Sequence, residues 1–138
     1  MSFDNPDDSA LRALLKKIRN IAVVGLSPRA DRPSYCVAKA IQGFGYNVIP
    51  VRPATAEVLG QKAYAALTDV PGPIDLVDVF RAAEHLDAIV DECIALKVPA
   101  LWIQEGIVNE AAARRAQEAG MTVVMDRCIY KDYVALCT

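Results

Sequence analysis

The stretch IAVVGLSPRADRPSY, residues 21–35, decides the fold. Its first four residues are apolar and mostly β-branched, and they lead straight into Gly25, as is typical of a strand buried on both faces of a parallel sheet. A polar loop follows, and Pro33 suits the first position of a helix. One apolar helical stripe comes next, at Val37, Ala40, Ile41 and Phe44. The stretch therefore predicts a strand, a loop and a helix in succession.

Units of the same kind follow along the rest of the chain. Four further apolar runs are predicted to be strands, at residues 47–51, 74–80, 100–103 and 121–125. The helical patterns are an amphipathic helix at 7–19, a weak turn at 63–67, a helix at 86–93, a helix from Asn109 to Gly120 and a short helix after Asp126. Strands that alternate with helices indicate a parallel sheet with right-handed crossovers.

The predicted fold class is α/β: a Rossmann-like, doubly wound parallel five-stranded sheet in a single domain, with an extra N-terminal helix. The expected parts of this domain, residues 1–138, are the N-terminal helix at 1–19, the core at 20–128 and a C-terminal tail at 129–138. We expect the strand order 3-2-1-4-5, with a flavodoxin-like order as the alternative.

Composition, charge and cysteine spacing exclude several classes of protein. Of 138 residues 54% are hydrophobic and 23% charged, which excludes a disordered chain. Fifteen Lys and Arg against seventeen Asp and Glu give a net charge of −2, so nucleic-acid binding is not expected.

No apolar run reaches the roughly 18 residues that span a bilayer. The acidic N-terminus lacks the pattern of a secretory signal, and the four cysteines form no CxxC pair, so we expect a cytoplasmic protein with reduced thiols and no zinc site.

The loops after the strands are the candidate ligand sites, because ligands of such sheets bind outside the carboxyl ends of the strands. The first loop is not GxGxxG, since Ser27 stands where a second glycine is expected. It offers hydroxyl and guanidinium groups beside a helix start, which suits a diphosphate. These groups belong to Ser27, Arg29, Arg32 and Ser34. The alternative is a solvated loop ahead of an ordinary helix.

The second loop begins with Arg52 and Pro53. An NAD-binding protein usually has an acidic residue near this point, whereas an arginine accommodates a phosphorylated ribose. Arg52 therefore favours NADP, or coenzyme A (CoA) with its 3′-phosphate, over NAD. The alternative, an ordinary surface arginine, has equal weight on this residue alone.

The remaining loops carry weaker signals. Phe80 and Arg81 follow the third strand, Gln104 to Ile107 follow the fourth, and Arg127 and Cys128 follow the fifth. Gly106 lets the backbone approach a ligand closely, or else belongs to a helix-entry turn. Arg127 is a candidate anion-binding residue, and Cys128 is more simply explained as a small buried hydrophobic residue.

Catalytic groups are sparse. His85, the only histidine, falls at a helix start without a Ser or Cys partner in sequence. Asp75 and Asp78 lie three positions apart in a strand, so they point to opposite faces and make no acid/base pair. No Walker A or HExxH motif is present. The sequence predicts a protein that binds a ligand rather than one that catalyses a reaction.

Taken together, the five loop segments resemble the small CoA-binding proteins related to the N-terminal domain of the succinyl-CoA synthetase α subunit. The matching segments are IAVVGLSPRADRPSY, NVIPVRP, IDLVDVFR, LWIQEGI and VVMDRC. The resemblance implies a fold that holds the ADP part of CoA, or of an acyl-CoA, at the carboxyl ends of the strands. The implied site residues are Gly25, Ser27, Arg32, Pro33, Ser34, Arg52, Pro53, Val79, Phe80, Arg81, Gln104, Gly106, Ile107, Arg127 and Cys128.

Within this implied site, the first loop cradles the diphosphate and Arg52 binds the 3′-phosphate. The synthetase also needs a phosphate-carrying histidine on a second domain and a partner subunit, so ligase activity by this chain alone is not expected. The alternatives are an NADP-dependent oxidoreductase and a nucleotide-binding subunit of a larger enzyme. Two further hypotheses are a mixed disulfide between Cys128 and the CoA thiol and assembly as a homodimer.

Overall fold

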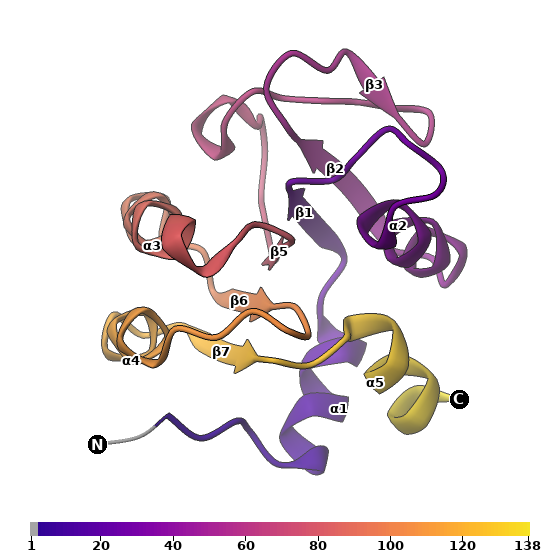
Figure 1. The fold of residues 1–138 in the computed structure, drawn as a ribbon. Helices are drawn as coiled ribbons and strands as arrows, with labels where there is room; N and C mark the ends of the chain where they lie inside the picture. The colour runs from indigo at the N-terminus through magenta and orange to yellow at the C-terminus, as the bar shows by residue number, and fades with distance from the viewer. Residues whose placement is uncertain (1–2) are drawn as a thin grey trace.

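Five parallel strands form the central sheet of the computed structural model, which describes residues 3–138 (Figure 1). They are β1 (Asn20–Val24), β2 (Asn47–Val51), β5 (Leu76–Val79), β6 (Ala100–Ile103) and β7 (Thr122–Met125). Every residue of β5 and β6 is buried, which confirms strands covered on both faces.

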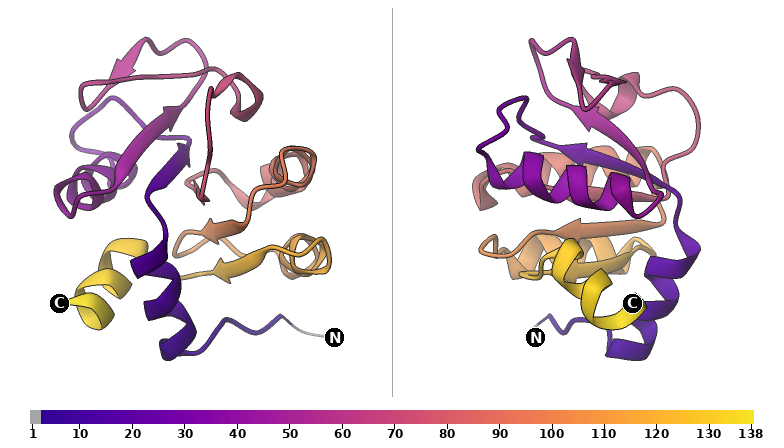
Figure 2. Two further views of the ribbon diagram at one scale, coloured as in Figure 1. Left: turned by 180° about the vertical axis from the view of Figure 1, so that it is seen from behind. Right: turned by 90° about the vertical axis from the view of Figure 1, so that its right-hand side faces the viewer.

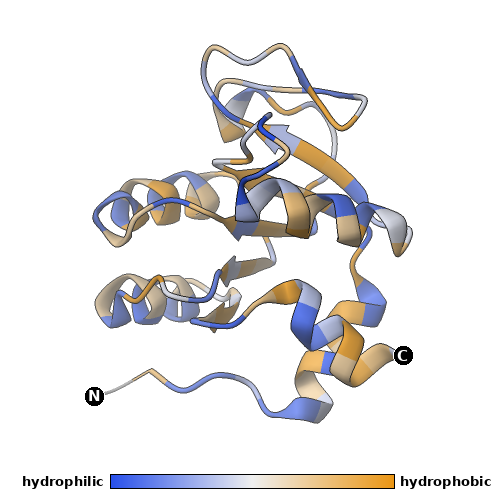
Figure 3. Cartoon of the chain, turned by 45° about the vertical axis from the view of Figure 1, so that its right-hand side comes forward, coloured by the Kyte–Doolittle hydropathy of each residue, from blue (hydrophilic) through white to orange (hydrophobic). Residues whose placement is uncertain are grey.

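Helices cover both faces of this sheet (Figure 2). One face packs against α1 (Asp8–Lys17), α2 (Pro33–Gly43) and α5 (Ile129–Cys137). The other packs against α3 (Leu86–Ala95) and α4 (Glu110–Glu118). Figure 3 shows the resulting pattern, with mostly apolar strands between helices that carry both apolar and polar residues. The predicted doubly wound α/β fold and its extra N-terminal helix are confirmed.

The strand order is β2-β1-β5-β6-β7, the flavodoxin-like order, so the expected order 3-2-1-4-5 is wrong. The chain after β2 explains the difference, because it covers the outer edge of β2 itself. Tyr64 pairs with Val51 in a parallel bridge, its N–H donates to the Pro50 carbonyl at 3.0 Å, and the Arg52 N–H donates to the Tyr64 carbonyl at 2.8 Å. With that edge occupied, β5 pairs with the other side of β1.

One detail of the predicted elements also changes. The weak helical turn expected at 63–67 is wrong, because a small hairpin of β3 (Glu57–Val58) and β4 (Gln61–Lys62) precedes the bridge, and the following turn is a 3-10 helix at Leu67–Asp69. The short helix predicted after Asp126 is confirmed, because α5 forms nearly all of the segment 129–138.

The segment before α1 protects the far edge of the sheet. The Asn5 side chain accepts a hydrogen bond from the Met125 N–H at 2.8 Å and donates one to the Met125 carbonyl at 2.9 Å. Phe3 is buried in the core on the α3 and α4 side. An amide side chain therefore satisfies backbone groups of β7 that an edge strand would otherwise expose.

One polar side chain lies inside the core without a partner. Asp78, in β5, is 0% exposed, and neither carboxyl oxygen has a hydrogen-bond partner within residues 3–138. Its neighbours on the adjacent strands are Val23 and Trp102. Asp75, by contrast, accepts hydrogen bonds from the backbone N–H groups of Arg19 and Asn20. Burial raises the pKa of Asp78 well above its ordinary value, because the charged form would lose its hydration.

We therefore predict that Asp78→Asn stabilises the protein increasingly as the pH rises. The folded state keeps the Asp78 proton, whereas the unfolded chain releases it above about pH 4, so wild-type stability falls by up to about 1.4 kcal/mol per pH unit between the two pKa values. Urea unfolding of wild type and variant between pH 4 and 7 measures the difference. Exposed Asp69→Asn is the control. A stability difference for Asp78→Asn that does not change with pH would contradict the prediction.

Candidate functional site

A cavity of about 470 Å³ lies outside the carboxyl ends of β1, β2 and β5. In a flavodoxin-like sheet this is the switch point, where successive crossovers run to opposite sides and ligands bind. The cavity is lined by Gly25, Ser27, Arg29, Arg32, Pro33, Ser34, Arg52 and Phe80. All of these except Arg29 are site residues implied by the sequence resemblance. We call this space the loop cavity.

Three arginines and no acidic residue line the loop cavity. Arg29 lies 3.4 Å from Asp31 in an exposed ion pair. Arg32 and Arg52 have no ion-pair partner in the part of the chain that the structure describes. Pro33 begins α2 here, so the first backbone N–H groups of that helix add to the positive potential. The site suits an anion with several charges.

The two serines of the loop cavity shape the loop that carries the arginines. The Ser27 N–H donates to Ser34 Oγ at 3.0 Å, and the Arg29 N–H donates to Ser27 Oγ at 3.1 Å. Both serines are nearly buried, with 7% and 6% of their surface exposed. The first loop is therefore a hydrogen-bonded turn anchored to α2 rather than a freely solvated segment.

Gly25 sets how closely the first loop approaches the third. Its φ is +86°, a left-handed conformation that side chains disfavour. A Cβ at this position would lie 2.9 Å from the Phe80 carbonyl oxygen and 2.9 Å from Arg81 Cδ. Because Gly25 lacks that atom, the exits of β1 and β5 pack directly against each other.

Pro53 and Arg81 line a second, smaller cavity of about 180 Å³ rather than the loop cavity. This smaller cavity lies on the α3 side, beside Val24, Val51 and Leu67. His85, which the sequence places at a helix start, is exposed and also lines this cavity. The sequence feature that could have placed His85 at this cavity is its position, four residues after Arg81 in the segment that follows β5. Val79 is fully buried in the core and lines neither cavity.

The fourth and fifth loops bind each other and do not line the loop cavity. Gln104 Oε1 accepts from the Ile129 N–H at 3.2 Å, and Asp126 Oδ1 accepts from the Gly106 N–H at 2.7 Å. Ile107 packs against the core on the α3 and α4 side. The structure therefore gives Gln104 and Gly106 clear roles in joining the two loops.

Arg127 is held by the first turn of α5. Its Nε and Nη2 donate to the two carboxyl oxygens of Asp132 at 2.6 and 2.9 Å, and this bond raises the pKa of Arg127. Its backbone carbonyl accepts from Trp102 Nε1 at 2.8 Å. Cys128, at the N-cap of α5, is only 8% exposed. A mixed disulfide between Cys128 and CoA, formed under oxidation or by exchange with CoA disulfide, stays a prediction.

Comparison with known proteins shows the family of the chain. A family model described as the CoA binding domain matches residues 19–133. The chain belongs to this family. The match covers all five strands and the whole of the first two loops.

Individual relatives of this CoA-binding domain fall into two groups. The protein named "Uncharacterized protein YneT" of Bacillus subtilis (strain 168) is 46% identical over 127 residues, which cover 92% of this chain and 94% of that protein. The α subunit of acetate–CoA ligase (ADP-forming) II of Pyrococcus furiosus is 33% identical over 76 residues, which cover 54% of this chain but 17% of that subunit. The chain therefore corresponds to a small part of the ligase.

A solved structure of similar size has nearly the same fold. The hypothetical protein from Pyrococcus horikoshii OT3 superimposes with a TM-score of 0.94 at 33% identity, over 100% of this chain and 97% of that one.

Two kinds of feature are absent from residues 3–138. No group of three or more His, Cys, Asp or Glu side chains is arranged to hold a metal ion. None of the helices in this range is long and apolar enough to cross a membrane.

The close approach at Gly25 yields a prediction. Gly25→Ala should lower the free energy of unfolding by more than the roughly 1–2 kcal/mol expected for an alanine at positive φ, because its Cβ also collides with Phe80 and Arg81. Gly60→Ala is the matched control, since Gly60 has a φ of +75° and open space around its Cβ. Chemical denaturation of both variants measures the two losses. Equal losses would show that the contact at Gly25 is unimportant.

Proposed function

We propose that this protein binds coenzyme A, or an acyl-CoA, with the ADP part of the ligand in the loop cavity. The observation that carries the proposal is the arginine-lined cavity at the N-terminus of α2, at the switch point of the sheet. Membership of the CoA-binding domain family supports CoA over other nucleotides.

The charges of CoA match the positions of the cavity's donors. The diphosphate would lie against the N-terminus of α2 beside Arg29 and Arg32, where backbone N–H and guanidinium groups converge. Arg52 enters the cavity from β2 and is our candidate for the 3′-phosphate. Pro53 and Arg81 would contact the ligand only where it extends from the loop cavity into the smaller one.

We further propose that the chain acts as a binding module and not as a catalyst. His85 is exposed, and its nearest charged partner is Glu84 at 3.8 Å. Cys128 and Cys93 are buried, and the Asp78 carboxyl has no access to solvent. No nucleophile among these residues is hydrogen-bonded to a base, which is the arrangement that covalent catalysis needs.

The direct test is calorimetric titration with CoA, dephospho-CoA and NADP in one buffer. We predict that CoA binds more tightly than dephospho-CoA, and that Arg52→Ala reduces this preference roughly tenfold or more, because a hydrogen bond to a charged group is lost. Arg12→Ala is the control, since Arg12 lies in α1 and does not line the loop cavity.

Two outcomes would contradict the proposal. Equal wild-type affinity for CoA and dephospho-CoA would remove Arg52 from the 3′-phosphate. Tighter binding of NADP than of CoA would instead favour the oxidoreductase alternative, for which the same arginine would hold the 2′-phosphate.

A further inference from the structure

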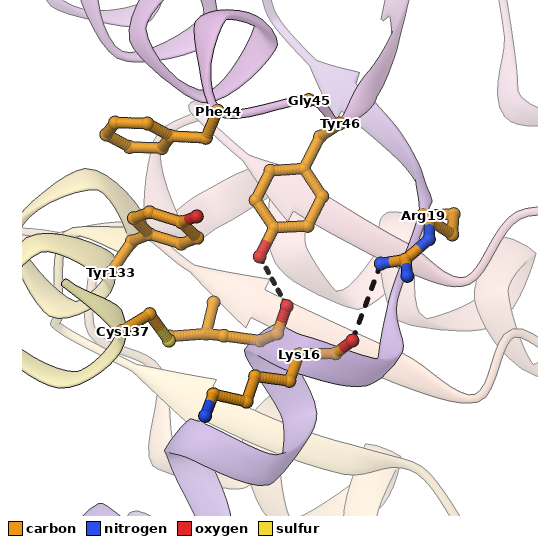
Figure 4. A pocket seen from close by; sticks show the side chains of 8 residues that line it. Lys16, Arg19, Phe44, Gly45, Tyr46, Tyr133 and Cys137 are labelled. Carbon is orange, nitrogen blue, oxygen red and sulfur yellow. Dashed lines mark hydrogen bonds between the residues drawn. The ribbon is translucent and has the colours of Figure 1, made fainter.

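A separate cavity of about 370 Å³ lies near the amino ends of β1 and β2, at the opposite end of these strands from the loop cavity (Figure 4). Three segments far apart in sequence form it: the end of α1 and the residues that follow, the turn between α2 and β2, and the last half of α5. It shares no lining residue with the loop cavity. We call it the entry cavity.

Aromatic rings form one wall of the entry cavity. Phe44 and Tyr133 stack with their centroids 4.0 Å apart and their planes inclined by 10°, and Tyr46 meets Tyr133 edge-on at 5.8 Å. The Tyr46 hydroxyl donates to the Leu15 carbonyl, and burial raises the pKa of Tyr46, so its ring is a fixed, neutral surface. A flat apolar group would find both a ring face and a ring edge here.

Two cations border the same space. Lys16 and Arg19 line the entry cavity, and no acidic residue does. Figure 4 shows Lys16 and Arg19 on different sides of the opening. Arg19 Nη1 donates to the Ile18 carbonyl at 3.1 Å and to the Lys16 carbonyl at 3.4 Å, whereas the side-chain nitrogens Nε and Nη2 make no hydrogen bond within residues 3–138. In the same range the Lys16 ammonium makes no ion pair.

The helix ends limit what kind of anion fits. α1, α2 and α5 all end beside the entry cavity, so their C-terminal carbonyl groups make this region less positive than the N-terminus of α2. A highly charged phosphate would meet these carbonyls and would leave the aromatic wall uncovered. A singly charged carboxylate on a flat ring can place its charge beside Lys16 and its ring against the tyrosines.

We propose that the entry cavity is a second ligand site, which takes small planar carboxylates such as aromatic acids. The site is independent of the loop cavity and of the CoA proposal. The carboxylate accepts a hydrogen bond from the Lys16 ammonium, the Arg19 guanidinium adds positive charge on the other side of the opening, and the ring lies against Tyr46 and Tyr133.

The test is a ¹⁵N–¹H NMR titration of the protein with benzoate. The amide signals of Gly45, Tyr46 and Cys137 should shift in a saturable way, whereas those of Gly25 and Ser34 should not. Lys16→Gln should weaken benzoate binding roughly tenfold, because a charge-assisted hydrogen bond is lost. Lys17→Gln is the matched control, since Lys17 is exposed, adjacent in the same helix and absent from the cavity lining.

Analogues of benzoate keep the test independent of whether the variants fold. Benzamide, which has the same shape without the charge, should bind at least tenfold more weakly, and so should cyclohexanecarboxylate, which has the charge without a flat ring. Equal binding of either analogue would overturn the proposal. So would the absence of shifts at about 20 mM benzoate, an affinity too weak for a built site, and the two cations would then serve only the helix ends.

Discussion

The direct packing of the first loop against the third is the contact on which the site depends. Gly25 takes a positive φ and brings the backbone after β1 within van der Waals distance of Phe80 and Arg81. The N-terminus of α2 borders the cavity at the carboxyl ends of the strands, where Arg52 arrives from β2. Any side chain at position 25 would separate β1 from β5 at the point where the cavity forms. The site is therefore built on a backbone contact, and the arginines supply its charge.

The sequence predicted the class of fold but not the order of its strands. Short continuous apolar runs identified all five strands, since strands buried on both faces are apolar along their length. Pro50 also held information on strand order, because a proline cannot donate to a neighbouring strand and is confined to edges. In the expected order the second strand would have been internal. The Tyr64 bridge, which closes the edge of β2, has no comparable local signal.

The sequence predicted the site residues whose position follows from the ends of the parallel strands. It could not predict which side chains form hydrogen bonds or ion pairs with other parts of the protein. The first two loops and Phe80 were identified because the carboxyl ends of parallel strands converge. Arg127 resembles the other loop arginines in sequence, yet its guanidinium is bound by Asp132. The entry cavity forms between three segments that are distant in sequence, so no sequence motif predicts it.

We propose that the N-terminus of α2, with its neighbouring arginines, is a phosphate site. A crystal structure of the protein with CoA tests it most directly. We expect the diphosphate within hydrogen-bond distance of the first N–H groups of α2 and of Arg32, with the 3′-phosphate on Arg52. A diphosphate bound elsewhere, with the loop cavity filled by solvent alone, would contradict it.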